Sequence, residues 1–94
     1  MELSFTMRVT VPADILRREL DNESVILNLN SGSCFVLDES GTRMWTVLTT
    51  SESIQAAYEV LLDEYDVEAK LLRQDLHELI EKLIEHDLVE VSDG

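Results

Sequence analysis

The sequence predicts a small α+β domain in which an N-terminal antiparallel sheet of about three strands is followed by three helices. In the first part of the chain, apolar residues alternate with polar ones, which is the period of a half-buried strand. From residue 38 onward the apolar residues recur at helical spacing instead. The chain has 94 residues, which suits one domain around a single core, so we expect residues 1–94 to form one domain.

The expected strands precede residue 38. Residues 5–12 alternate with period two, and residues 15–20 form a short mixed segment that could extend into another strand. After a polar turn, residues 25–30 and 34–37 have the pattern of a hairpin, and Gly32 lies in its turn, where a positive φ is expected.

Three helices are expected after the hairpin. Asp38 is the predicted N-cap of the first helix and Ser53 of the second, because their side chains accept hydrogen bonds from the free N–H groups of a first turn. The third helix is expected from about Glu68 to His86. Its apolar stripe consists of Leu72, Leu76, Leu79, Ile80 and Leu83. Residues 88–91 follow as a wing or a closing strand, so the helical part resembles a winged helix-turn-helix.

The charge of the chain argues against nucleic acid as a partner. The net charge is −13, from 20 acidic and 7 basic residues. From Thr50 onward, 13 acidic residues stand against 3 basic ones, a net of −10. A DNA-reading winged helix needs Lys and Arg there to neutralise phosphates. We therefore expect no nucleic-acid and no membrane partner, whereas a basic partner would be attracted. Solubility is the alternative role of the charge.

The sequence contains no recognisable catalytic or metal-binding set. Cys34 is the single cysteine and is expected to be reduced and structural. His77 and His86 fall on opposite faces of the third helix, too far apart to share a metal. There is no Gly-rich phosphate loop or nucleophile elbow. We therefore expect a non-enzymatic protein without cofactor or metal. Because no segment has the pattern of a signal peptide or membrane span, we also expect the protein to be cytoplasmic.

The segment 34–37 is the candidate binding element. Both of its alternating faces are apolar, so one can join the core while the other lies under a helix of this chain or under a partner. The residues leave both possibilities open. If this strand is the edge of a sheet, its unpaired N–H and C=O groups can bond an extended peptide as an added strand.

Two stretches, LNLNSGSCFVLDESGTRMWTVL and EYDVEAKLLRQDLHELIEKLIEHDLVEV, resemble the PqqD family, and the resemblance covers roughly residues 25–91. The features in family order are an apolar hairpin, Gly41 and Trp45 at a strand-to-helix junction, Tyr65 with Asp66 after the second helix, and Asp75 with Leu76 in the third. The resemblance implies a non-catalytic module that binds the leader segment of a ribosomally synthesised precursor peptide. The module would present the core segment to a separate maturation enzyme.

The resemblance also implies where the leader binds. In the family the leader adds as a strand beside the third strand and lies in a groove formed with the third helix. The corresponding positions are Cys34, Phe35, Val36, Leu37, Leu71, Leu72, Asp75, Leu79 and Lys82. Acidic residues near this groove would favour a leader that carries Lys or Arg, an inference from charge alone.

The implied partners are a precursor leader peptide and a maturation enzyme such as a radical SAM protein or a leader peptidase. The sequence does not separate pyrroloquinoline quinone biosynthesis from lasso-peptide maturation, or a monomer from a homodimer. The alternatives are a winged-helix regulatory or protein-interaction module, and an accessory subunit of a larger enzyme.

Overall fold

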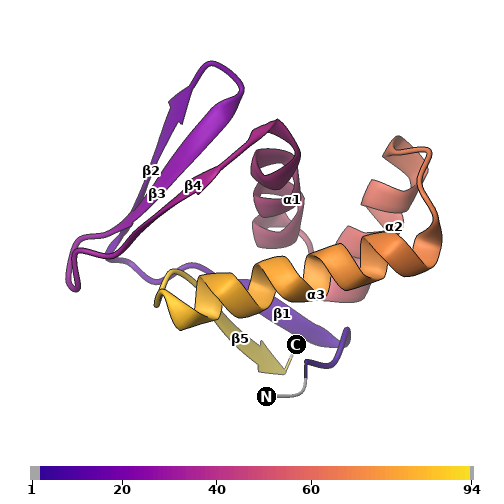
Figure 1. Cartoon of the computed structure of the whole chain (residues 1–94). Helices are drawn as coiled ribbons and strands as arrows, with labels where there is room; N and C mark the ends of the chain where they lie inside the picture. Colours follow the sequence, from indigo (N-terminus) through magenta and orange to yellow (C-terminus); the bar gives the residue numbers. More distant parts are fainter. Residues whose placement is uncertain (1–2, 94) are drawn as a thin grey trace.

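The computed structural model describes residues 3–93 of the chain; residues 1, 2 and 94, which the one-domain prediction includes, lie outside the described residues. In the described part, four strands precede three helices and a last strand follows them (Figure 1). The elements are β1 (Met7–Thr10), β2 (Ile15–Leu20), β3 (Glu23–Asn28), β4 (Cys34–Leu37), α1 (Glu39–Thr50), α2 (Ile54–Glu64), α3 (Ala69–Glu85) and β5 (Glu90–Asp93). The predicted α+β class and the order of strands before helices are confirmed.

The N-terminal sheet is antiparallel and has the strand order β2-β3-β4. Its register places Val25 of β3 between Arg18 of β2 and Val36 of β4. The segment expected only as a possible extension, β2, is thus a complete strand of six residues. Among the described strands, β4 pairs with β3 alone, so its other side is an open edge of the sheet.

The first predicted strand does not belong to this sheet. It forms β1, which pairs with the C-terminal β5 and sets Val9 opposite Val91. The segment after the third helix is therefore a closing strand and not a free wing. It begins two residues later than expected, because Leu88 and Val89 are buried in the core before pairing starts. A period of two identifies a strand but not its partner.

Both predicted helix caps are present. The Asp38 side chain accepts a hydrogen bond from the Gly41 N–H at 2.8 Å, and the Ser53 hydroxyl accepts one from the Ala56 N–H at 3.1 Å. The predicted stripe of α3 also faces the core, although Leu79 is only half-buried.

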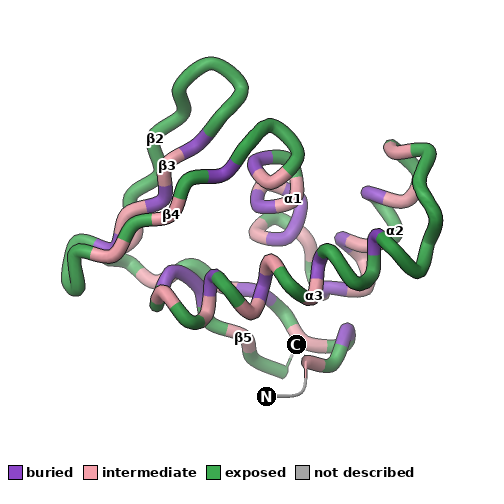
Figure 2. Tube along the Cα trace, in the orientation of Figure 1, coloured by how far each residue is buried: buried purple, intermediate pink, exposed green. Residues whose placement is uncertain are grey.

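The core lies where the three helices meet β3 and the β1–β5 pair (Figure 2). Its largest fully buried apolar side chains come from β3, the three helices and the segment before β5: Ile26, Leu48, Ile54, Leu61, Leu76, Ile80, Leu83 and Leu88. Within residues 3–93, none of the helices combines the length and the apolar character that crossing a membrane requires.

Candidate functional site

A groove of about 370 Å³ lies between β4, the start of α1 and the middle of α3. It is lined by Glu23, Phe35, Val36, Leu37, Asp38, Gly41, Asp75, Glu78, Leu79 and Lys82. The groove therefore runs beside the open edge of the β2–β3–β4 sheet and has a helix as its opposite wall.

The β3–β4 turn determines which backbone groups face the open edge. The Gly32 N–H donates to the Asn28 carbonyl, and the Asn28 N–H donates to the Ser33 carbonyl, both at 2.8 Å. This is a bulge that requires a positive φ at its first residue, and Gly32 supplies it at 79°. Along a strand, the N–H and C=O groups of successive residues point alternately to the two sides. The backbone groups of Phe35 and Leu37 therefore point to β3. Cys34 and Val36 then direct their N–H and C=O groups to the open edge.

Two contacts hold the strand and the helix together at one end of the groove. The Phe35 ring packs against the His86 ring, with 5.3 Å between ring centroids and the planes tilted by 51°. The buried Asn28 amide donates to the Asp87 carbonyl at 2.7 Å. The amide oxygen of Asn28 accepts hydrogen bonds from the backbone N–H groups of Asn30 and Ser31, which lie in the β3–β4 turn. The two walls are therefore fixed relative to each other without a ligand.

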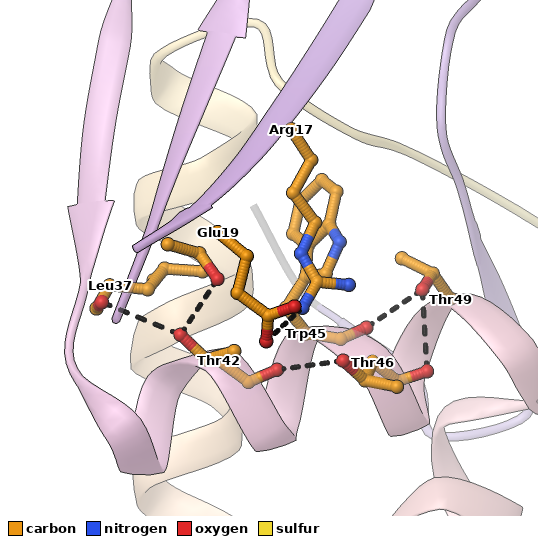
Figure 3. Close-up of polar contacts among 8 residues, drawn as sticks. Arg17, Glu19, Leu37, Thr42, Trp45, Thr46 and Thr49 are labelled. Carbon is orange, nitrogen blue, oxygen red and sulfur yellow. Dashed lines mark hydrogen bonds and ion pairs between the residues drawn. The ribbon is translucent and has the colours of Figure 1, made fainter. Parts of the chain in front are cut away.

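The other end of the groove is fixed by the β4–α1 junction. The Thr42 hydroxyl lies 3.0 Å from the Ser24 hydroxyl and 3.4 Å from the Leu37 carbonyl (Figure 3). A Cβ at Gly41 would come within 3.2 Å of the Leu37 side chain and 3.3 Å of the Asp38 carboxylate. Glycine at this position therefore allows the first turn of α1 to pack closely against the end of β4.

The groove is acidic. Its charged lining consists of the carboxylates of Glu23, Asp38, Asp75 and Glu78 and the ammonium group of Lys82. The local charge is thus −3, within a chain whose net charge is −13. Charges of one sign that line a concave surface concentrate the field there, so this groove attracts cationic groups.

Most of the predicted site residues meet in this groove. Phe35, Val36 and Leu37 line it from the strand, and Asp75, Leu79 and Lys82 from the helix.

The remaining predicted positions lie elsewhere. Cys34 begins the same strand as an exposed free cysteine, so it does not pack in the core as free cysteines usually do. Leu72 is 2% exposed and belongs to the core, whereas Leu71 is 52% exposed and lies outside the lining.

Four lining residues were not predicted from the sequence: Glu23, Asp38, Gly41 and Glu78. Glu78 lies three residues after Asp75 and four before Lys82, so helical spacing could have identified it. Glu23 could not be identified in this way, because its position depends on the strand register.

A second hollow, of about 580 Å³, lies between the inner side of β2, α1 and the end of α2. Its charged groups are largely paired with one another: Arg17 with Glu19, and Arg43 with Glu64. The hydrogen bond from Arg43 holds the pKa of the Glu64 carboxyl below its ordinary value of 4.5. This hollow is larger and lies beside β2, the other edge strand of the sheet, but most of its charged groups are already held in ion pairs, so the groove beside β4 is the stronger candidate.

The fold and the groove together define a small α+β domain that offers an open strand edge beside a helix. The family model described as coenzyme PQQ synthesis protein D (PqqD) matches residues 23–89, which include both walls of the groove. The chain therefore belongs to the PqqD family, and the resemblance noted in the sequence is confirmed.

The structure is also similar to a solved one, TbiB1 in complex with the TbiA(beta) leader peptide. The two chains share 26% sequence identity with a TM-score of 0.79, over 86% of this chain and 94% of TbiB1. No curated protein matches the chain.

Proposed function

We propose that this protein binds the leader segment of a ribosomally synthesised precursor peptide by adding it as a strand to β4. The observation that carries the proposal is the open β4 edge, to which the backbone groups of Cys34 and Val36 point, and Val36 also lines the groove. Membership of the PqqD family and the likeness to TbiB1, which was solved with a leader peptide, support it.

Binding rather than catalysis is the activity of such a domain. The PqqD family consists of non-catalytic leader-binding proteins, so the chain is not an enzyme. By holding the leader, it would raise the local concentration of the attached core segment at a maturation enzyme, to the millimolar range for a short linker. This role needs no reactive side chain in the groove.

The lining of the groove defines the leader chemistry that fits it. Main-chain hydrogen bonds to Cys34 and Val36 would contribute affinity that is independent of leader sequence. Phe35, Leu37 and Leu79 offer apolar contacts to alternate leader side chains. The surplus of carboxylates favours Lys or Arg in the leader next to the added strand. Lys82 is placed to receive a leader carboxylate.

We propose that the second partner is a maturation enzyme that acts on the leader-bound precursor, such as a radical SAM protein or a leader peptidase. Both pyrroloquinoline quinone biosynthesis and lasso-peptide maturation use PqqD-like domains, and both fit this chain. The precursor that binds identifies the pathway.

The test is a titration of isotope-labelled protein with the leader peptides encoded beside it, followed by backbone amide shifts. A scrambled peptide of the same composition is the control. We expect saturable shifts confined to residues 33–37 and to the side of α3 that carries Asp75, Leu79 and Lys82. Shifts restricted to α2 or to the β1–β5 pair would contradict the site, and a flat titration with every leader would contradict the function.

A further inference from the structure

The outer face of the β2–β3–β4 sheet is apolar and uncovered. Residues opposite each other in an antiparallel pair lie on the same face of the sheet, so the register shows which residues form the outer face. The outer face consists of Leu16, Arg18, Leu20, Glu23, Val25, Leu27, Cys34 and Val36. None of them is buried, and Leu20 and Val36 are 64% and 61% exposed. Within residues 3–93, α1 packs on the opposite, inner face.

Two of the three outward residues of β2 are apolar, which is not expected for a strand with a solvated outer side. An antiparallel sheet with one face in water normally turns apolar residues inward and polar residues outward. In β2 the charged Arg17 and Glu19 point inward, toward α1 (Figure 3), while Leu16 and Leu20 point outward. A contiguous exposed apolar face of this kind marks an interaction surface.

We propose that this outer face docks the maturation enzyme, through an apolar enzyme surface that carries a carboxylate opposite Arg18. The inference rests on the proposed leader-binding function. Arg18 is central on the face, with Val25 beside it on β3 and Val36 beyond on β4. Arg18 and Glu23 are the two charged residues of the face, and Arg18 is the central one, so a partner surface that covers it must supply a negative charge there.

The size of the face favours this occupant over a second copy of the chain. Six residues at ~3.3 Å and three strands at ~4.8 Å give an outline of roughly 20 by 14 Å, or ~280 Å². A standard interface buries ~800 Å² on each partner. Two copies would meet on this small area against a charge of −13 each. An enzyme can instead extend its contact onto the leader strand added next to β4.

This geometry makes enzyme docking depend on the leader. The outward side chains of an added strand would continue the same face beyond Val36, so the enzyme would contact the protein and the leader together. By thermodynamic linkage, the factor by which the leader strengthens enzyme binding equals the factor by which the enzyme strengthens leader binding.

The test compares two double variants of the 94-residue chain. Leu16→Lys with Leu20→Lys alters the outer face. Val60→Lys with Val67→Lys is the matched control, because these valines are 43% and 45% exposed and lie on α2 and just after it. Binding of the purified enzyme encoded beside the precursor is measured by surface plasmon resonance, with and without leader. Binding of a labelled leader is measured by fluorescence anisotropy.

We expect the face variant to lose at least tenfold in enzyme affinity and the control less than twofold, with leader affinity within twofold of native for both. Arg18→Glu should also weaken enzyme binding, whereas Arg18→Lys, which keeps the positive charge, should bind the enzyme with near-native affinity. Native-like enzyme affinity in the face variant would overturn the inference, as would an equal loss in the control.

Two further outcomes separate this inference from the proposed function. If the native chain binds leader but never the enzyme, docking fails and leader recognition stands. If it binds no leader at all, the proposed function fails first. Sedimentation then measures the oligomeric state of both proteins. If the native protein is a dimer and the face variant is a monomer, the face binds a second copy of the chain, and the assignment to the enzyme is overturned.

Discussion

Replacing Val36 by proline tests strand addition at a single backbone group. Backbone N–H groups point alternately to the two sides of β4, and the hydrogen bond from the Asn28 N–H to the Ser33 carbonyl fixes which of them face β3. The Val36 N–H therefore points to the open edge, away from β3. Proline removes this donor without removing a bond of the β3–β4 ladder. Proline is tolerated on edge strands where the N–H side faces solvent, so the variant should fold.

The expected loss of leader affinity follows from one missing hydrogen bond. A backbone hydrogen bond contributes about 0.5–1.5 kcal/mol net, which corresponds to about a 2- to 12-fold weaker Kd. The edge position keeps the loss within this range, because Val36 is 61% exposed and water can satisfy the leader carbonyl left behind. Val36→Thr is the matched control, since it has a similar shape and keeps the N–H; its Kd should stay within ~2-fold of native.

The assay is fluorescence anisotropy of a labelled leader, with helical content checked by circular dichroism. A folded Val36→Pro protein with native leader affinity would refute strand addition at β4. A Val36→Thr protein that weakens as much as Val36→Pro would show that the side chain, and not the backbone donor, makes the contact.

Three other outcomes are expected. Ile80→Ala should lower the free energy of unfolding by ~2–5 kcal/mol in a denaturant titration, because this fully buried side chain leaves a cavity in the core. Asp75→Asn with Glu78→Gln should weaken binding of a basic leader and flatten its salt dependence; an unchanged salt slope would remove charge from the recognition model. Glu64→Gln should be less stable than native at neutral pH. Because the Arg43 hydrogen bond lowers the folded-state pKa of Glu64, the native advantage is present above pH ~4.5 and is lost as the pH falls through the lowered pKa, so thermal denaturation curves should converge in acid.

The sequence predicted the elements well wherever the signal is local. Asp38 and Ser53 cap their helices as expected, because an N-cap depends on residues only two or three positions away. Gly32 takes the positive φ that a tight hairpin turn requires. The stripe of α3 was visible for the same reason, since residues three and four apart share one helix face.

The features that depend on distant pairing were not predictable in this way. Nothing near β1 indicates that its partner is β5 at the other end of the chain. The same limit explains the partial prediction of the site. Glu23 and Asp38 reach the groove through the sheet register and the β4–α1 junction, whereas Leu72, which shares the helix with Asp75, rotates into the core.

Asn28 shows how such distant pairing prepares the groove for its ligand. Its side chain joins the β3–β4 turn to the carbonyl of Asp87, a residue 59 positions later that follows the C-cap of α3 and has a left-handed backbone with φ 56°. Neither residue has a local pattern that identifies the other. Because this link and the Phe35–His86 ring contact set the spacing of strand and helix in the free protein, little binding energy is needed to order the walls. If the leader adds to β4 as proposed, an edge of only four residues would be long enough to bind an extended peptide, since the leader alone would have to become ordered.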